Sequence, residues 1–200
     1  MADTTNHAPT AGPVAGAATP DGRFRGVHDL AITVHTVEHP AVFTVDQSQA
    51  VRRQVDEALG GGGDGGTAGH GKCLFLKDKK DRFVLVAALE STAVDLKALR
   101  RRLVAAGQPL QTLSFASAER LGQVMGVEPG TVTPFALLNP SARNVRVVLD
   151  PSLFACRRVH FHPLRNTATT AIGPDDLVRF MESCGRAPLR LALGADEAAA

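Results

Sequence analysis

The chain has 200 residues, which is enough for one domain with a substantial core. Its formal net charge is only +2, which excludes a strong overall field for nucleic acid, so any RNA contact has to be a local patch. The sequence contains no Trp and no Tyr, and this argues against a platform of aromatic side chains that stack on bases.

Three cysteines, Cys73, Cys156 and Cys184, are widely spaced and form no CxxC pair. This pattern predicts neither a disulfide framework nor a zinc knuckle, and it favours a reducing, cytoplasmic location. No apolar run approaches the ~20 residues of a membrane span, so no membrane partner is expected. The N-terminus lacks a basic segment followed by an apolar core, so a secretory signal is not expected either.

Residues 1–21 are mainly Ala, Thr, Pro and Gly, and they predict a disordered tail because they bury too little apolar surface to offset their ordering entropy. A transit peptide is the less favoured alternative, since no arginine precedes Arg23. One domain is expected over residues 22–194, followed by a short tail over 195–200. Within it, the glycine-rich run 60–71 predicts a flexible surface insertion, because it lacks the GxxxxGK[ST] order of a phosphate-binding loop.

Hydrophobic periodicity and capping signals predict the elements of this domain. The first half of the domain is predicted to contain a short helix over 23–31, a strand over 32–37, a helix from Thr44 or Asp46 to about Leu59, a hairpin of two strands over 71–86 and a helix over 95–105. A helix over 118–125 follows, capped by Ser117 and ended by Gly126, and then a short strand over 135–138, a turn over 139–144 and a strand over 145–149. The last elements are a bent strand pair over 157–161 and 167–172, a helix over 175–184 opened by Pro174, and an edge strand over 189–193. Strands thus come in hairpin-like pairs between helices, without a regular βαβ rhythm. We therefore expect an α+β fold with a mixed, largely antiparallel sheet or partial barrel flanked by helices.

The hairpin over 71–86 carries charged residues at both ends. Lys72 stands at the mouth of its first strand, directly after the glycine-rich run, and spacing alone allows either an ordinary strand-end cation or the charged group of a site. At the other end, Lys77, Lys79, Lys80 and Arg82 form a basic tip. A solvated turn is its default interpretation, and contact with nucleic-acid phosphates is its functional one.

A second candidate for a polar site is the loop at Gly130. This glycine lies in a Thr-rich turn closed by Pro134, and backbone N–H groups fixed in such a turn can hold a carbonyl or a developing oxyanion. An ordinary connection from helix to strand is the plainer interpretation. Asn166 likewise offers side-chain donors at the bend after His162, or simply braces that bend.

His160 and His162, which alternate along a predicted strand near Cys156, are candidates for a metal site. Such a site needs a third and usually a fourth ligand, and two histidines of this kind are more often surface or hydrogen-bonded residues. We therefore expect no metal and no other cofactor.

Five sequence blocks, in this order and spacing, resemble the YbaK/prolyl-tRNA-synthetase-associated editing domain family, above all its free-standing prolyl-tRNA editing members. The blocks are EHPAVFTV at 38–45, GKCLFLKD at 71–78, LSFA at 113–116, GVEPGTVTPF at 126–135 and FHPLRNTAT at 161–169. The resemblance covers roughly residues 23–193, and it implies the α+β fold of that family.

The resemblance implies a trans-editing aminoacyl-tRNA deacylase that hydrolyses Ala-tRNA(Pro). A smaller amino acid always fits a larger synthetase pocket and loses only ~1–3 kcal/mol of contact, so a second, smaller site has to remove alanine. The implied partner is the acceptor end of mischarged tRNA, with prolyl-tRNA synthetase as a candidate second partner. The alternatives are a deacylase of Cys-tRNA(Pro) or of a broader set of Ala-, Ser- and Thr-tRNAs, or a tRNA- or synthetase-binding module without catalysis.

The family's motifs also imply roles for residues of this chain. Catalytic roles fall on Lys72 as a positive charge, on the N–H groups of Gly130 and Thr131 in the family's GxxxP loop, and on His162. The residues implied to bind substrate are His39, Phe43, Cys73, Val132, Thr133, Pro134 and Asn166, and those implied to bind tRNA are Lys77, Lys79, Lys80 and Arg82. The family commonly has Asn where this chain has Cys73, and this difference leaves the amino-acid specificity open.

Overall fold

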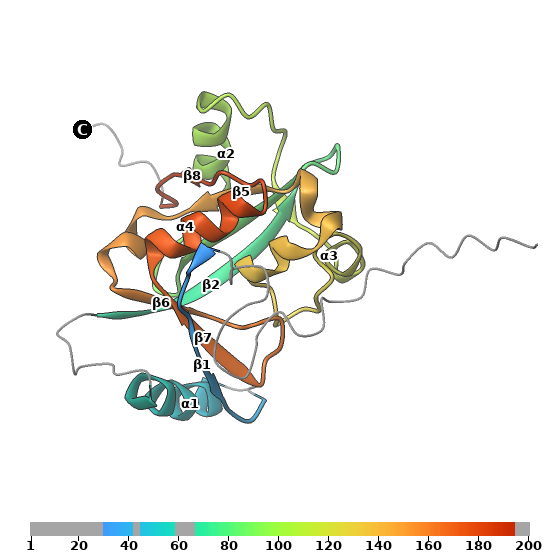
Figure 1. Ribbon diagram of the computed structural model, residues 1–200. Coiled ribbons are helices and arrows are strands. Elements are labelled where there is room, and N and C mark those ends of the chain that lie inside the picture. The colour runs from blue at the N-terminus through green and yellow to red at the C-terminus, as the bar shows by residue number, and fades with distance from the viewer. Residues whose placement is uncertain (1–29, 42–44, 59–66, 195–200) are drawn as a thin grey trace, which may run out of the picture.

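The computed structural model describes residues 30–41, 45–58 and 67–194 (Figure 1). Its strands are β1 (His35–Glu38), β2 (Ala68–Lys77), β3 (Phe83–Leu89), β4 (Ser114–Phe115), β5 (Arg146–Leu149), β6 (Arg158–Phe161), β7 (Ala168–Ile172) and β8 (Leu189–Arg190). Its α-helices are α1 (Val45–Ala58), α2 (Leu96–Ala105), α3 (Ala118–Met125) and α4 (Pro174–Ser183), and its 3-10 helices are η2 (Pro134–Leu138), η3 (Pro140–Asn144) and η4 (Pro151–Ala155). The predicted tails, residue Phe43 and nearly all of the predicted helix 23–31 lie outside the described residues.

The strands form one mixed sheet in the order β1-β7-β6-β2-β3-β5-β8, with β4 paired to β2 (Figure 1). The pairs β1–β7, β6–β7, β2–β3 and β2–β4 are antiparallel, whereas β2–β6, β3–β5 and β5–β8 are parallel. This confirms the predicted α+β class and mixed sheet. Among the described strands the sheet stays open, with β1 and β8 at its edges.

Strand alternation divides the core into two clusters on opposite faces of the sheet. On β2, Phe75 belongs to the larger cluster, which also contains the buried side chains of α3, α4 and η2. The next residue, Leu76, belongs to the smaller cluster, which lies under Leu99 and Leu103 of α2. The sheet is therefore covered by α3 and α4 on one face and by α2 on the other.

The predicted helices agree with the observed ones to within a residue or two at each end. Local signals explain this, and α3 is the clearest example: Ser117 accepts a hydrogen bond from the N–H of Arg120 at its start, and Gly126 ends it with a left-handed φ of 67°. Asp95 caps α2 in the same way. None of the helices in the described ranges is long and apolar enough to cross a membrane.

Two predicted elements were wrong. Residues 135–138 were expected to form a strand, but they belong to the 3-10 helix η2, whose first position is Pro134 and whose cap is Thr133. A short apolar run is equally typical of a buried helical turn, so periodicity could not separate the two. The predicted insertion 60–71 also ends earlier than expected, because β2 begins at Ala68 and pairs there with β6.

The start of β2 depends on glycine, because another strand approaches it closely. A Cβ atom at Gly71 would lie 2.2 Å from Cε1 of Phe161, whose ring is buried in the larger core. Any side chain at this position would therefore push the aromatic ring of β6 away from β2.

We predict that Gly71→Ala lowers the free energy of unfolding by about 1–3 kcal/mol, the usual cost of overpacking a core. Denaturant-induced unfolding measures this value. Gly122→Ala is the matched control, because its Cβ in α3 would meet nothing within 4 Å, and alanine is favoured over glycine in a helix by about 0.5–1 kcal/mol. Equal effects of the two substitutions would contradict the close approach of Phe161.

Candidate functional site

A row of polar residues lies on one face of the half-sheet made of β1, β7, β6 and β2. On β6, Val159 and Phe161 enter the larger core, as Ile172 does on β7 and Phe75 does on β2. Residues that alternate with these four fall on the opposite face of the sheet. This polar face comprises His39, His70, Lys72, His160, His162 and Thr169.

Lys72 is held at the start of β2 by main-chain acceptors. Its Nζ donates to the carbonyl oxygens of Glu90 at 2.9 Å and Thr92 at 2.5 Å, and its side chain is half-buried. Among the described residues it has no carboxylate partner. Because an ammonium has three donors, this geometry fixes a positive charge and leaves one N–H for a ligand.

The two histidines at the β1–β7 end differ in how their ring nitrogens are used. Nδ1 of His162 lies 2.9 Å from the carbonyl oxygen of Ala168, so Nδ1 is a donor, and in the neutral form of the ring Nε2 is the acceptor. In the described part of the chain, Nε2 makes no hydrogen bond. His39 uses both nitrogens, on the Pro40 carbonyl at 2.9 Å and on Oγ1 of Thr169 at 3.0 Å. The ring centroids of His39 and His162 are 6.1 Å apart, so the buried His39 braces the wall beside His162.

The Gly130 loop is a tight turn. The N–H of Thr131 donates to the carbonyl of Glu128 at 3.0 Å, with Pro129 and Gly130 at the centre and φ of 88° at Gly130, as a type II turn requires. The N–H of Thr131 thus closes the turn, and the expected contact of the Gly130 and Thr131 N–H groups with a substrate stays a prediction. The N–H of Gly130 makes no hydrogen bond to another described residue.

A pocket of about 440 Å³ lies between this turn and the bend after His162. Thr131 lines one wall and Asn166 the other, so the structure brings these two predicted residues together. Arg165 also lines the pocket, and its guanidinium pairs with Glu38 of β1 at 2.5 Å. Lys72 does not line this pocket. Lys72 and His162 thus lie on the polar face, whereas Thr131 and Asn166 line this pocket. The bend after His162 connects the two regions along the chain.

The other residues predicted to bind substrate pack against the larger core or are buried beside it. Cys73 packs against the larger core, on the face of β2 opposite Lys72, and burial raises the pKa of its thiol. Val132 also packs against this core. Thr133 and Pro134 are buried at the start of η2, where Oγ1 of Thr133 accepts a hydrogen bond from the N–H of Phe135. These neighbours support the positions of the loop and the strand, and the expected substrate contacts of these residues stay predictions.

The basic hairpin tip is built around one buried carboxylate. Burial opposes the ionisation of Asp78, but hydrogen bonds from the Arg82 guanidinium and from the N–H groups of Gln111, Arg82 and Lys80 outweigh it and hold the pKa of Asp78 well below its usual range. Nε of Arg82 donates to Asp78 Oδ2 at 2.8 Å. Arg82 is therefore committed to the turn.

The three lysines of the tip differ in the same respect. Lys77 pairs with Asp81 at 2.9 Å, whereas Lys79 and Lys80 are exposed. Of the four residues predicted to bind tRNA, Lys79 and Lys80 thus have the freest side chains.

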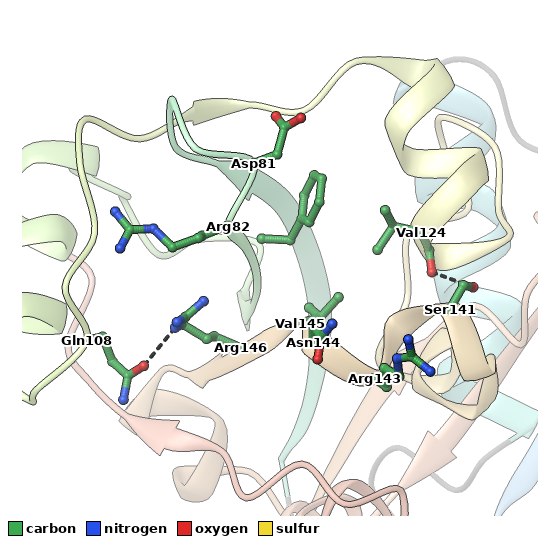
Figure 2. Close-up of a pocket in the computed structure, with 10 residues that line it drawn as sticks. Asp81, Arg82, Gln108, Val124, Ser141, Arg143, Asn144, Val145 and Arg146 are labelled. Carbon is green, nitrogen blue, oxygen red and sulfur yellow. Dashed lines mark hydrogen bonds between the residues drawn. The ribbon is translucent and has the colours of Figure 1, made fainter.

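A basic pocket of about 620 Å³ lies below the tip. Figure 2 shows Arg143 across this pocket from Arg82 and Arg146, each from a different segment of the chain. Nε of Arg146 donates to Oε1 of Gln108 at 2.7 Å (Figure 2). Because the Arg82 guanidinium is held by Asp78, Arg143 and Arg146 are the pocket's candidates for binding a phosphate. The sequence analysis missed these two residues, because their position across a pocket from the hairpin tip depends on the fold.

The family model of the aminoacyl-tRNA editing domain matches residues 68–180, more than half of the chain. The chain belongs to this family. Prolyl-tRNA synthetase associated domain-containing protein 1 of Bos taurus is 33% identical over 165 residues, which cover 81% of this chain and 88% of that protein. The prolyl-tRNA editing protein ProX of Acetoanaerobium sticklandii is 31% identical over 159 residues, which cover 78% of this chain and 87% of that protein.

A solved structure of similar fold has been described as a candidate trans-editing enzyme for prolyl tRNA synthetase. It aligns with a TM-score of 0.55 and 20% identity over 80% of this editing-domain chain and 87% of the other. These findings confirm the family that the five sequence blocks indicated.

Two residues of the editing domain's polar region were missed by the sequence analysis, namely Asp56 of α1 and His70 of β2. His70 lies in the run that was interpreted as a loop, so its pairing with His160 was not considered. The metal candidates considered instead, His162 and Cys156, do not join His160: the group of possible ligands among the described residues is Asp56, His70 and His160.

We predict that Arg82→Ala lowers the free energy of unfolding at pH 7 by about 3 kcal/mol, because it leaves the buried Asp78 carboxylate without its cation. The folded-state pKa of Asp78 lies below the unfolded value of about 4, so this stabilisation is full at neutral pH and is lost as the pH falls below about 4. Chemical denaturation at several pH values measures both effects. Lys79→Ala, at the same turn, should leave stability unchanged; a similar loss in both variants would refute the structural role of Arg82.

Proposed function

We propose that this editing-domain protein is a trans-acting deacylase that hydrolyses the ester of Ala-tRNA(Pro) in the cytoplasm. The observation that carries this proposal is the arrangement of the polar face, where Lys72 is held as a cation by two carbonyl groups and Nδ1 of His162 is hydrogen-bonded to Ala168, which leaves Nε2 for a substrate or water. The name of the ProX relative as a prolyl-tRNA editing protein supports the same substrate class.

The polar face offers the two groups that the proposed ester hydrolysis uses, a cation and a base. His70 and His160 are direct partners in the parallel β2–β6 pair, and Lys72 and His162 each follow two residues later. Lys72 and His162 are therefore candidates to act on one substrate from neighbouring strands. In the proposed reaction, the N–H of Lys72 stabilises the negative charge that develops on the ester carbonyl oxygen.

His162 would position and activate the attacking water. Nε2 takes a proton from the water as the water oxygen bonds to the carbonyl carbon. The tetrahedral intermediate then breaks its bond to the terminal ribose oxygen, which receives that proton from Nε2. The hydrogen bond from Nδ1 to Ala168 fixes the tautomer that makes Nε2 basic. The N–H of Gly130 is a second candidate donor for the substrate; it precedes Thr131, which lines the pocket together with Asn166.

The tRNA backbone would contact the basic pocket and the exposed lysines of the hairpin tip. Arg143 and Arg146 offer guanidinium groups to phosphates, and Lys79 and Lys80 extend the positive surface. Backbone contacts of this kind position the acceptor end without reading its sequence. Prolyl-tRNA synthetase is proposed as a second partner.

The first test is a deacylation assay with purified Ala-tRNA(Pro), Cys-tRNA(Pro), Ser- and Thr-tRNAs, and Pro-tRNA(Pro). The proposal expects the fastest hydrolysis with Ala-tRNA(Pro) and none above background with Pro-tRNA(Pro). Faster turnover of Cys-tRNA(Pro), Ser-tRNA or Thr-tRNA would replace the proposed specificity. Binding of tRNA without hydrolysis of any ester would show a binding module instead of an enzyme.

We predict that Lys72→Ala slows hydrolysis of Ala-tRNA(Pro) by about 100-fold or more, the usual loss when one donor to a developing oxyanion is removed. Single-turnover kinetics measures this rate, and thermal unfolding checks the fold. Lys97→Ala removes an exposed lysine of α2 and is the matched control. Unchanged turnover in a folded Lys72→Ala protein would remove Lys72 from the mechanism.

We also predict that His162→Ala lowers kcat by about 10²–10⁴-fold, as expected for loss of a positioned base. His35→Gln changes an exposed histidine of β1 and should keep wild-type kcat. An increase in KM with kcat unchanged would assign His162 to binding alone.

A further inference from the structure

Three potential metal ligands meet where α1 covers the polar face. His70 of β2 and His160 of β6 are direct partners in a parallel ladder, so their side chains lie on the same face. Their rings meet edge to face, with centroids 5.1 Å apart. The carboxylate of Asp56 reaches them from α1, and one ligand atom from each of the three residues lies within 4.8 Å of the others.

Two atoms of this group are buried without a hydrogen-bond partner. They are Nδ1 of His160 and Oδ1 of Asp56. The side chain of His160 is only 2% exposed, and its Nδ1 points to Asp56 Oδ1 across 3.6 Å, a distance too long for a hydrogen bond. A buried polar atom without a hydrogen-bond partner is unfavourable. A bound ion or water between His160 Nδ1 and Asp56 Oδ1 would remove this cost.

The spacing of these atoms fits a shared metal ion. Two ligands bound to one tetrahedral Zn²⁺ at 2.0–2.2 Å are about 3.3–3.6 Å apart. The separation between His160 Nδ1 and Asp56 Oδ1 is 3.6 Å, and that between His70 Nε2 and either carboxylate oxygen is 3.2 Å. The two imidazoles and the carboxylate therefore need only small movements to coordinate one ion.

We propose that Asp56, His70 and His160 bind a divalent transition metal of the zinc class. Two imidazole nitrogens favour Zn²⁺, Co²⁺ or Ni²⁺ over Mg²⁺ and Ca²⁺, which prefer oxygen ligands. Three protein ligands leave a fourth position for water. The ion reaches the site from the side of Asp56, whose side chain is 37% exposed.

The metal would fasten α1 to the sheet. Asp56 lies in the last turn of α1, and His70 and His160 lie at the junction of β2 and β6. One ion would thus join three segments. This position is close to the candidate active site, because Lys72 lies two residues after His70 and His162 lies two residues after His160. The proposed role is structural, since it fixes the position of α1 over the polar face, and it holds whether or not the protein hydrolyses an aminoacyl ester.

The experiment is a titration of the full chain, freed of metal by a chelator, with Co²⁺ and Zn²⁺. We expect one Co²⁺ per chain, with the visible absorption bands of a tetrahedral or five-coordinate site, and its displacement by Zn²⁺. Asp56→Asn, His70→Ala and His160→Gln should each weaken binding by at least about tenfold, because changes even to outer-shell partners cost 10–100-fold. Asp175→Asn, at the start of α4 on the opposite face of the sheet, is the control and should bind as the wild type does.

A second measurement follows hydrogen exchange in α1. Zn²⁺ should slow the exchange of the α1 amides in the wild type and have no effect in the His70→Ala variant. This variant is chosen because the His70 side chain is only half-buried, so its loss disturbs the fold least. Absence of one-to-one binding would overturn the proposal and leave a water molecule as the group between Asp56 and His160. Binding that all three variants retain would also overturn it, by placing the ion elsewhere. Neither measurement uses tRNA, so the outcome is independent of the deacylation assays.

Discussion

The close packing of β6 against β2 is the constraint on which the rest of the structure depends. β2 is the central strand of the sheet, with β6, β3 and β4 as its partners. The parallel pairing of its first residues with β6 requires the ring of Phe161 to occupy the space that a side chain at position 71 would fill. This contact fixes the register in which His70 faces His160. The same register places Lys72 and His162 on one face, so the candidate chemistry follows from a packing requirement in the core.

Two groups of buried polar atoms differ in whether protein partners satisfy them. Asp78 is fully buried, yet a guanidinium and several backbone N–H groups satisfy it, and the hairpin tip becomes a rigid turn. Asp56 and His160 lie close together, but each keeps one buried atom without a partner. Protein groups satisfy the carboxylate in the first arrangement. The second arrangement leaves two atoms that the proposed metal ion would bind. This difference distinguishes a cation that supports the fold, Arg82, from a cluster that is suited to a ligand.

Much of the architecture could be predicted from the sequence, because its signals are local. Ser117, Gly126 and Asp95 mark helix ends through hydrogen bonds and backbone angles that involve only a few neighbouring residues. The hairpin containing Lys72 could likewise be predicted from its alternating apolar residues. The 3-10 helix after Thr133 was mistaken for a strand, since its burial on all sides is a property of the assembled core. Much of the candidate site, Lys72 and His162 included, was named through the resemblance of five sequence blocks to a family, and not through spacing.

The sequence by itself determined the α+β class, the helix boundaries, the family, and the candidate roles of Lys72, Gly130 and His162. Only the tertiary structure decided that Cys73 turns into the core while Lys72 turns away from it, and that the N–H of Thr131 is used inside its own turn. It alone brought Asp56 and His70 to His160. The physical reason is that capping and alternation act between residues near in the chain. Strand register and helix placement, in contrast, are set by how side chains such as Phe161 fill the space between distant segments.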